Sequence, residues 1–569
     1  MMRGGEFILP VDKLPDIFSI DDLSVEQKLI RQTVQEFVAD TIGKKEVYAA
    51  LESKDFVLTR KVMIELAETG LLGVEIPEEF GGGGLDKISS MIVTEEIAPL
   101  GSMAVSVLAH KGIGTWPIVL FGTREQKEKY LPKLASGEWI GAYSLTEGGS
   151  GSDANAARST AVKINGGYML NGEKIFVTNG GFADIFTVFV KLDGKLTAFI
   201  VEKNFSGVVI GREEHKMGIC GSSTTTLILN DVFVPDSNLL GESGKGFKIA
   251  MNVLNLGRFI LGVACLGSGR LCLEEATKYA KERKQFGRPI IEFGLIRQKL
   301  AEMSAKIFAM ESVMYRLAGL LEEACSQINA EDSNAVLKAI GEYAIECSLV
   351  KVFCSEALDY ITDENVQIHG GSGFCEELPV ARRYRDARIN RIFEGTNEIN
   401  RLFAISVFLK RAGELSLPAA ISQVLGEAIA PSQSVGPSDL IGKLLLQLNS
   451  AKKATLLASG TVAQTFHKPE ELESHQFILS QLCDSIISIY VLESVLAVLA
   501  KNSGVNDCRS YLTRLLFSQM LPEIGERLKN VVAGCVMGDD LRMRLSAIRR
   551  FLKSEPENIE FLHKQIMGA

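Results

Sequence analysis

The sequence predicts an α+β protein that is mostly helical, with its strands gathered in one central block. Three observations indicate this class. Apolar side chains recur at helical three-to-four spacing over residues 24–137, β-branched and aromatic runs follow over 139–235, and helical spacing returns from 246 to the end. Because the helices and strands are segregated rather than alternating, a doubly wound parallel sheet is disfavoured.

A chain of 569 residues is too long for one hydrophobic core, so several domains are expected. The order of the blocks predicts four of them. They are an N-terminal helical domain at 22–140, a central β-barrel or sandwich domain at 141–245, a C-terminal helical bundle at 246–412 and an additional helical domain at 413–569. The last boundary rests on a Ser-, Pro- and Gly-rich stretch at 416–439.

In the first block, Ser24 and Thr123 are each followed by helical spacing and are expected to cap helices. A short helix is predicted over 59–69, ended by Gly70. The four glycines at 81–84 are expected to form a turn.

The central block contains three runs that favour strands, at 168–180, 185–203 and 224–235, interrupted by Asn-Gly and Asp-Gly turns. Beyond it, the spacing predicts long helices over 246–283, 292–327, 331–361 and 397–413. Leucines at helical spacing over 440–460 predict one more helix. It is expected either to pack within the last domain or a dimer interface, or to lie on a membrane surface.

The composition is that of an ordinary globular protein, with 46% hydrophobic and 23% charged residues. A net charge of −9 argues against bulk nucleic-acid binding. The ten cysteines form no CxxC pair and the six histidines show no metal-ligand spacing, so no metal site is expected. The first residues lack the apolar core of a secretory signal, and we expect no membrane-spanning segment.

Two glycine-rich loops are similar in part to phosphate-binding motifs. Gly149–Ala154 contains a GxGxxA pattern, but no strand–helix–strand unit follows, which disfavours a dinucleotide-binding fold. Gly241–Phe247 lacks the first glycine and the Ser/Thr of a phosphate-binding loop, so that interpretation is rejected. Ser144, Thr146, Ser150 and Ser152 could still bind a flat polar ring or a phosphate.

The segment RIFEGTNEINRLF, Arg391–Phe403, places Glu394 between an apolar pair, Ile392 and Phe393, and Gly395. Taken alone, such a glutamate is most simply a turn or helix-start charge. The alternative is a base in an apolar pocket, where burial raises the pKa of a carboxyl toward neutral and suits it to proton abstraction.

Seven motifs occur in order: AYSLTEGGSGSDA, KIFVTNGGFADIFTVF, KMGICGSSTTTLILNDVFVP, LNLGRF, RKQFGRPIIEFGLIRQKLAEM, QIHGGSGF and RDARINRIFEGTNEI. Together they resemble the acyl-CoA dehydrogenase family over residues 22–410. FGLI at 293–296 and the helical tail resemble its very-long-chain branch. The resemblance implies that FAD lies between the β domain and the helical bundle, and that Glu394 is the catalytic base.

The resemblance also implies which residues bind the cofactor and substrate. Expected cofactor contacts are Tyr143, Leu145, Thr146, Gly151, Ser152, Phe176, Val177, Thr178, Arg283, Phe286, Gly294, Gln367, Ile368, His369, Gly370, Gly371, Thr396, Asn397 and Glu398. Of these, Arg283 and 367–371 are expected to act across a subunit boundary. Expected substrate contacts are Ser152, Ser222, Asn255, Arg258 and Gly395, with Asn255 and Arg258 near the CoA nucleotide.

Two positions depart from the family pattern: Gly148 stands where relatives often have Pro, and Gly294 where several have Gln. Gly395 is interpreted as admitting the thioester close to the main chain. The apolar pair before Glu394 is interpreted as excluding water. His369 is expected to be a loop residue, and the run Arg382, Arg383, Arg385 and Arg388 to be a salt-bridged face or a guide for CoA phosphates.

The function implied is FAD-dependent conversion of long- or very-long-chain acyl-CoA to trans-2-enoyl-CoA, the first step of β-oxidation. Electrons would pass to an electron-transfer flavoprotein. The enzyme is expected to be a homodimer, and peripheral contact with a membrane is a further expectation. Small residues Ser106, Ala109, Gly112 and Gly114 are expected to leave room for the acyl tail. The alternatives are an acyl-CoA oxidase and a respiratory-complex assembly scaffold that keeps the flavin fold. A bacterial cytoplasm is the first expectation for location, and the mitochondrial matrix or inner membrane the second.

Overall fold

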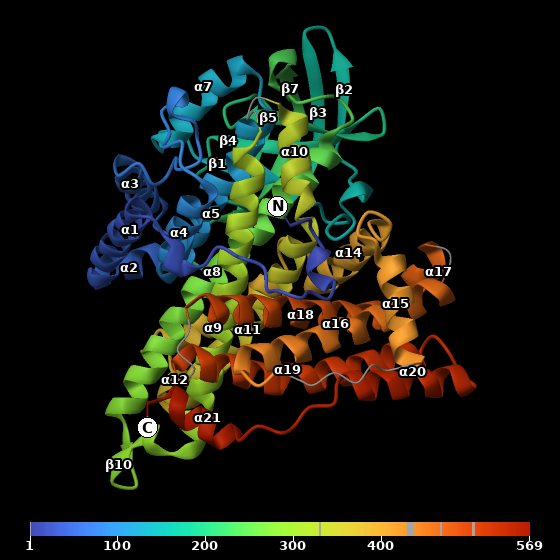
Figure 1. The fold of residues 1–569 in the computed structure, drawn as a ribbon. Coiled ribbons are helices and arrows are strands. Elements are labelled where there is room, and N and C mark those ends of the chain that lie inside the picture. The colour runs from blue at the N-terminus through green and yellow to red at the C-terminus, as the bar shows by residue number, and fades with distance from the viewer. Residues whose placement is uncertain (1, 329–331, 430–436, 467–468, 503–506, 569) are drawn as a thin grey trace.

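The computed structural model describes residues 2–328, 332–429, 437–466, 469–502 and 507–568. A central sheet has one group of helices beside it and a larger helical assembly below it (Figure 1). The N-terminal group comprises α1 (Val25–Gly43), α2 (Lys45–Glu52), α3 (Phe56–Glu68), α4 (Lys87–Ile97), α5 (Ser102–Ala109), α6 (Trp116–Phe121) and α7 (Arg124–Ala135).

Two of these helices begin where the sequence predicts. The Ser24 hydroxyl accepts from the Gln27 amide at 3.1 Å, and the Thr123 hydroxyl accepts from the Gln126 amide at 3.3 Å. The predicted start of α3 at residue 59 is wrong by one turn, because the Asp55 carboxylate caps the helix by accepting from the Leu58 amide at 2.9 Å.

Eight strands form a single sheet in the order β6-β7-β3-β2-β4-β5-β8, with β1 paired to β4. The strands are β1 (Gly141–Ser144), β2 (Thr160–Ile164), β3 (Gly167–Thr178), β4 (Ile185–Leu192), β5 (Lys195–Glu202), β6 (Val208–Glu213), β7 (Thr224–Pro235) and β8 (Leu239–Leu240). Asp193-Gly194 makes the predicted β4–β5 turn, with both residues at positive φ. Asn171-Gly172 lies inside β3, at a bulge, because Gly172 gives the Ser159 side chain room.

The helical bundle consists of α8 (Gly246–Glu282), α9 (Gly294–Ser326), α10 (Ser333–Glu342), α11 (Ala344–His369), α12 (Gly371–Phe374), α13 (Val380–Ala387) and α14 (Asn397–Lys410). A small hairpin of β9 (Lys284–Gln285) and β10 (Arg288–Pro289) connects α8 to α9. The prediction of a single helix over 331–361 is wrong, because the chain divides at Tyr343 into α10 and α11. Helix α11 continues to His369, so His369 is helical rather than in a loop.

The C-terminal helices are α15 (Leu417–Ile429), α16 (Leu440–Thr465), α17 (Pro469–Ser474), α18 (Gln476–Asn502), α19 (Cys508–Ala533), α20 (Gly538–Phe551) and α21 (Ile559–Ile566). In Figure 1, α16, α18 and α19 lie side by side below the bundle. Their buried side chains belong to the same hydrophobic cluster as those of α8, α9 and α11. The helices beyond residue 413 thus share one core with the bundle.

For residues 440–460 the sequence allowed either a helix packed within the protein or a helix on a membrane surface. In the structure, most of helix α16 packs within the protein. Leu444, Leu448, Leu456 and Leu457 are buried, and the Lys452 ammonium is buried in an ion pair with Glu493 of α18. These leucines face protein, whereas Leu446 of the same helix is 48% exposed, so membrane contact stays a prediction.

The N-terminal segment before α1 crosses the bundle and the C-terminal helices. The Gly5 amide donates to Glu346 Oε1 of α11 at 2.6 Å, and Lys452 Nζ of α16 donates to the Leu9 carbonyl at 2.9 Å. The Asn449 side chain exchanges hydrogen bonds with the backbone of Val11 at 2.7 and 2.9 Å. Residues 2–22 therefore fasten the last helices to the bundle.

Three helical stretches, Ser102–Phe121, Gly246–Glu282 and Gln476–Lys501, are long and apolar enough to cross a membrane by length and composition. The expectation of no membrane-spanning segment stays a prediction, because these stretches qualify by length and composition alone. Most of each stretch is buried inside the protein, which accounts for its apolar character.

Candidate active site

The loop before α14 holds Glu394 and Gly395 in succession at φ values of +57° and +80°. The Asn400 amide donates to the carbonyls of Gly395 at 2.8 Å and Thr396 at 3.0 Å, and Lys351 Nζ donates to the Gly395 carbonyl at 2.7 Å. A Cβ on residue 395 would lie 3.1 Å from Asn400 Nδ2. Glycine is thus required here by the left-handed backbone and by the approach of Asn400, a reason additional to the predicted access for substrate.

The Glu394 carboxylate lies against α8 at Gly257. A Cβ on residue 257 would lie 2.6 Å from Glu394 Oε2, so only glycine leaves room for the acid. Oε2 is buried and has no hydrogen-bond partner. Burial raises the pKa of Glu394 to about 7, against the lowering effect of the positive charges of Arg258 and Lys351.

That the apolar pair excludes water stays a prediction, and Ile392 is 48% exposed. Gly257 of α8 borders the carboxylate, and Arg258 of α8 and Lys351 of α11 place positive charges near it. Burial lowers the pKa of Lys351 to about 8, and the charge of Glu394 acts in the opposite direction.

Asn255 and Arg258 are buried beside the loop that carries Glu394. Arg258 is 3% exposed, donates to Asn255 Oδ1 at 3.0 Å, and is 3.4 Å through Nε from the Glu394 carbonyl. The predicted position near the CoA nucleotide stays a prediction. The pair supports the loop that carries Glu394.

Strand β1 contributes Tyr143, whose hydroxyl is buried without a hydrogen-bond partner. Burial raises the pKa of Tyr143, and the nearby Glu394 charge raises it further. The loop that follows is held to β3 by Lys174, which donates to Glu147 Oε1 at 2.6 Å and to the Leu145 carbonyl at 3.2 Å. Both residues lie in the quoted motifs, but their ion pair was not predicted, because a sequence does not show which charged residues pair when the chain folds.

At the end of β3 a bulge turns Phe176 outward. This residue has a φ of +56° and is 61% exposed, while its neighbour Val177 is buried in the sheet core. Val177 can therefore contact a cofactor only through its backbone. Leu145, Thr146 and Thr178 are half-buried nearby, and Gly151 and Ser152 are exposed.

The residues present fit a flat aromatic cofactor. An exposed phenyl ring and two buried polar atoms without partners, Tyr143 Oη and Glu394 Oε2, are the features that a bound ring system and substrate would satisfy. Thr396 caps α14, Asn397 is buried behind the loop and Glu398 is exposed.

The other predicted cofactor residues form a second cluster at the far end of α8. Arg283 and Gly294 are exposed, Phe286 is 92% exposed, and His369 stacks on Tyr279 with ring centroids 4.2 Å apart. Gln367, Gly370 and Gly371 are exposed beside it, and Ile368 is buried. Along α8, Gly257 and Tyr279 are separated by roughly 33 Å at 1.5 Å per residue. Figure 1 shows β10 at the opposite end of the molecule from the sheet.

Ser222 lies inside its own loop rather than on a surface. Its side chain is fully buried and accepts from Lys216 Nζ at 2.8 Å while donating to the Ile219 carbonyl at 2.9 Å. Its contact with substrate stays a prediction, as do those of Ser152 and Gly395.

A cavity of about 80 Å³ lies between α5, α8, α11 and the segment that leads to Glu394. Its wall includes Ala104 and Leu108 of α5, Ala264 and Ser268 of α8, and Phe393. The small residues predicted to make this space do not line it: Gly114 approaches the backbone of Gly141, and Gly112 packs on Trp116. Ser106 and Ala109 are likewise absent from the wall.

The arginine run is mainly salt-bridged. Arg383 is bidentate to Glu275, with its closest bond at 2.8 Å, and Arg385 pairs with Glu376 at 2.6 Å. Arg382 donates to the Tyr48 hydroxyl at 2.8 Å. These contacts favour the structural interpretation of the run.

The sequence matches three successive family descriptions: "Acyl-CoA dehydrogenase, N-terminal domain" over 24–138, "middle domain" over 142–232 and "C-terminal domain" over 244–407. A further "Acyl-CoA dehydrogenase, C-terminal domain" description matches 450–550. A probable acyl-CoA dehydrogenase of Bacillus subtilis is 44% identical over 98% of this chain and 96% of that protein. A bovine mitochondrial very long-chain specific acyl-CoA dehydrogenase is 39% identical over 76% of this chain and 68% of that protein.

Among solved structures, the acyl-CoA dehydrogenase of Bacillus anthracis complexed with FAD superimposes with a TM-score of 0.96. The two sequences are 43% identical, and the match covers 100% of this chain and 98% of that chain. Fold and site together define an FAD-dependent oxidoreductase. The chain belongs to the acyl-CoA dehydrogenase family.

Proposed function

We propose that this enzyme oxidises long-chain acyl-CoA thioesters to trans-2-enoyl-CoA, with Glu394 as the base that removes the α-proton. The observation that supports this proposal is the cavity, whose wall includes Phe393, the residue before Glu394, and part of α8. Its wall includes Ala264, Ser268 and Cys272, two to four turns beyond Gly257.

The length of that path favours long substrates. From Ala264 to Cys272, the first and last residues of α8 in the wall, the helix advances roughly 12 Å at 1.5 Å per residue. An extended chain advances about 1.2 Å per bond, as the backbone does. A tail that followed the wall to Cys272 would therefore place about ten carbons along it, in addition to those between the thioester and Ala264.

The chemistry asks Glu394 to accept a proton from carbon. FAD, when bound, supplies the acceptor for the hydride that leaves the β-carbon. Glu394 Oε2 receives the α-proton, and its raised pKa makes it a stronger base than an exposed carboxylate. Phe393, which lines the cavity, helps to keep water from the acyl chain.

The active enzyme that we propose is a homodimer. One cluster lies by Gly257 and the other by Tyr279, roughly 33 Å further along α8, so a cofactor that touched both would bridge two chains. Electron-transfer flavoprotein is the proposed acceptor, as the family resemblance implies. A bacterial cytoplasm is the proposed location, supported by the Bacillus relative that aligns over nearly the whole chain.

Two substitutions at different depths of the cavity test the chain-length proposal. Phenylalanine at Ala264 fills the cavity nearer to Glu394 than phenylalanine at Ser268, one turn further along α8. We expect the wild type to prefer long acyl-CoA, Ser268→Phe to prefer intermediate chains and Ala264→Phe shorter ones. The measurement is kcat/KM over a series of acyl-CoA lengths with electron-transfer flavoprotein as acceptor.

Leu273→Phe is the matched control, since Leu273 is half-buried on the same helix but does not line the cavity. Its chain-length optimum should equal that of the wild type. A wild-type optimum at butyryl-CoA would refute the proposal, and stoichiometric peroxide without added acceptor would assign the enzyme to the oxidases instead.

A further inference from the structure

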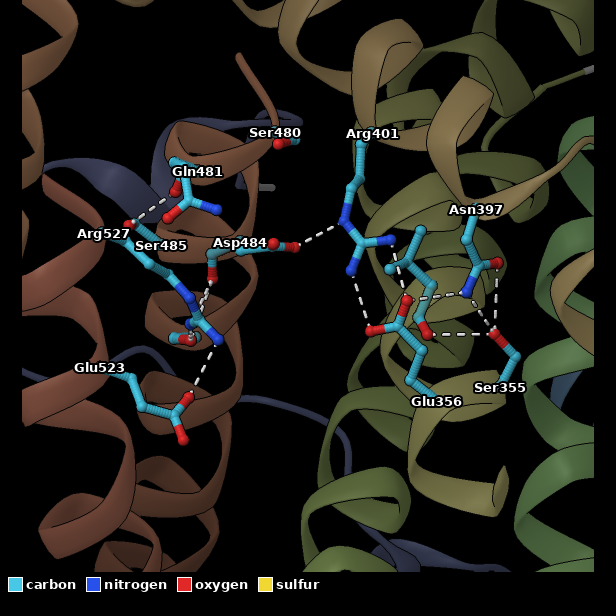
Figure 2. Close-up of polar contacts among 12 residues, drawn as sticks. Ser355, Glu356, Asn397, Arg401, Ser480, Gln481, Asp484, Ser485, Glu523 and Arg527 are labelled. Carbon is cyan, nitrogen blue, oxygen red and sulfur yellow. Dashed lines mark hydrogen bonds and ion pairs between the residues drawn. The ribbon is translucent and has the colours of Figure 1, made fainter. Parts of the chain in front are cut away.

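The helix that follows the catalytic loop is tied to the C-terminal helices by one arginine. Arg401 of α14 donates through Nε to Asp484 Oδ1 of α18 at 2.6 Å, and through its terminal nitrogens to both oxygens of Glu356 at 2.8 and 2.9 Å. Figure 2 shows Arg401 between the two carboxylates, with Asp484 on one side and Glu356 on the other. The guanidinium can satisfy both because its donors are fixed in one plane.

From Glu356 the network continues to the catalytic loop. Asn397 Nδ2 donates to Glu356 Oε1 at 3.0 Å, and Asn397 Oδ1 accepts from Lys351 Nζ at 2.7 Å. The same ammonium donates to the Gly395 carbonyl at 2.7 Å. The orientation of the Asn397 amide is unambiguous, because an ammonium only donates and a carboxylate only accepts.

On its other side the network is anchored within the C-terminal helices. Arg527 of α19 donates to the Asp484 carbonyl at 3.4 Å and to Ser488 Oγ at 3.1 Å, and pairs with Glu523 at 2.9 Å. The side chains of Arg401 and Asp484 are only 14% and 19% exposed. Limited solvent access makes their charge-assisted bonds stronger than those of a surface pair.

The catalytic loop needs such external support. Glu394 and Gly395 are both left-handed, and for Glu394 this conformation is strained. A strained backbone persists only where several contacts over-determine it. Part of that set of contacts comes from α18, which lies outside the first three family domains.

We propose that Asp484 and Arg401 are positioning residues for the dehydrogenation, through which the C-terminal helices hold the loop of Glu394 in its reactive geometry. The proposal rests on the proposed role of Glu394 as the base. Neither residue touches substrate; they act through Glu356, Asn397 and Lys351.

The test compares Asp484→Asn with a matched variant of another partly buried ion pair. Glu557→Gln weakens the bidentate Arg514–Glu557 pair, which also belongs to the C-terminal helices but is not connected to the loop. For Asp484→Asn we expect kcat with a saturating acyl-CoA to fall by about twofold to thirtyfold, the range for a network that modulates a distant site. KM should stay near the wild-type value, because no substrate contact is lost. Glu557→Gln should leave both constants unchanged.

Hydrogen exchange gives a readout that does not depend on turnover. Amides of the peptide 391–403 should exchange faster in Asp484→Asn than in Glu557→Gln, at equal FAD content. Asp484→Glu keeps the carboxylate, so it should recover part of the kcat and part of the protection of the loop amides. Arg401→Lys loses the planar set of guanidinium donors and should resemble Asp484→Asn.

Equal kcat and equal loop exchange in Asp484→Asn and Glu557→Gln would overturn the proposal. So would a loss in Asp484→Asn confined to KM. Glu394→Gln separates this failure from that of the proposed function: if that variant turned over normally, the base assignment itself would be wrong, whatever Asp484 does.

Discussion

At the scale of single residues, the chemistry depends on how an ordinary glutamate is made basic. Glu394 is desolvated by α8 and the loop around it, and its Oε2 atom has no hydrogen-bond partner. The charged groups that face it are Arg258 from α8 and Lys351 from α11, with the phenol of Tyr143 from β1. Desolvation prevails over the two cations, so the pKa of Glu394 rises to about 7.

This predicts the pH dependence of the enzyme. A base must be deprotonated to act, so kcat/KM should rise with pH through a limb near 7 and level off above it. Glu394→Gln should fold and bind FAD but lose roughly a thousandfold in turnover, the scale of general-base catalysis. The checks are steady-state kinetics from pH 5.5 to about 8.5 and the flavin absorbance of the purified variant. A variant that retained activity would exclude Glu394 as the base.

The sequence was sufficient to propose Glu394 as the base, since its segment belongs to an ordered set of motifs. It could not indicate what Gly257, Lys351 or Lys174 contacts. Gly257 and Lys174 belong to two of those motifs, but each of the three residues lies in a regular helix or strand, where nothing local shows its partner. Their roles arise only when tertiary packing brings α8, α11 or β3 against a loop that is distant in the chain.

At the scale of elements, caps and periodicity predicted well where the signal is local. Ser24 and Thr123 start helices as expected, whereas the break at Tyr343 was missed because apolar spacing continues across it. Helix α11 also carries Glu346, whose carboxyl is buried under the N-terminal segment. Burial raises the pKa of Glu346 to about 7, against the effects of the Gly5 amide and the charges of Arg316 and Arg411.

Glu346 should therefore make stability depend on pH. Its folded pKa lies above the ordinary value of 4.5, so its favourable contribution is complete below pH 4.5 and is lost as pH rises through about 7. The shift corresponds to about 3 kcal/mol at 1.36 kcal/mol per pKa unit. Glu346→Gln, which removes the buried charge, should raise Tm relative to the wild type at pH 8 and change it little at pH 5.

Glu342→Gln is the control, because Glu342 also binds the N-terminal segment, through the Gly4 amide at 2.8 Å, but is partly exposed. Calorimetry at both pH values gives the comparison. An equal Tm difference between Glu346→Gln and the wild type at pH 5 and pH 8 would contradict the assignment.

At the scale of the whole molecule, the order of helical, β and helical blocks followed from the sequence. The sequence did not predict that the helical bundle and the C-terminal helices share one hydrophobic core. Amphipathic spacing shows that a helix has a buried face but not which helix covers it, so the contact of α14 with α18 could not be predicted. The same limitation hid the role of residues 2–22, which carry no periodic pattern.

The long reach of α8 has a genetic consequence. Because Glu394 and the cluster around Phe286 lie far apart on each chain, two differently defective chains should complement each other in a mixed pair. A Glu394→Gln chain keeps a sound distal end, and a Phe286→Asp chain keeps a sound base, so their heterodimer retains one working centre of its two. Co-expression with distinct affinity tags and sequential purification would isolate that hybrid. Activity above that of either parent is expected; an inert hybrid would mean that each chain builds its centre alone.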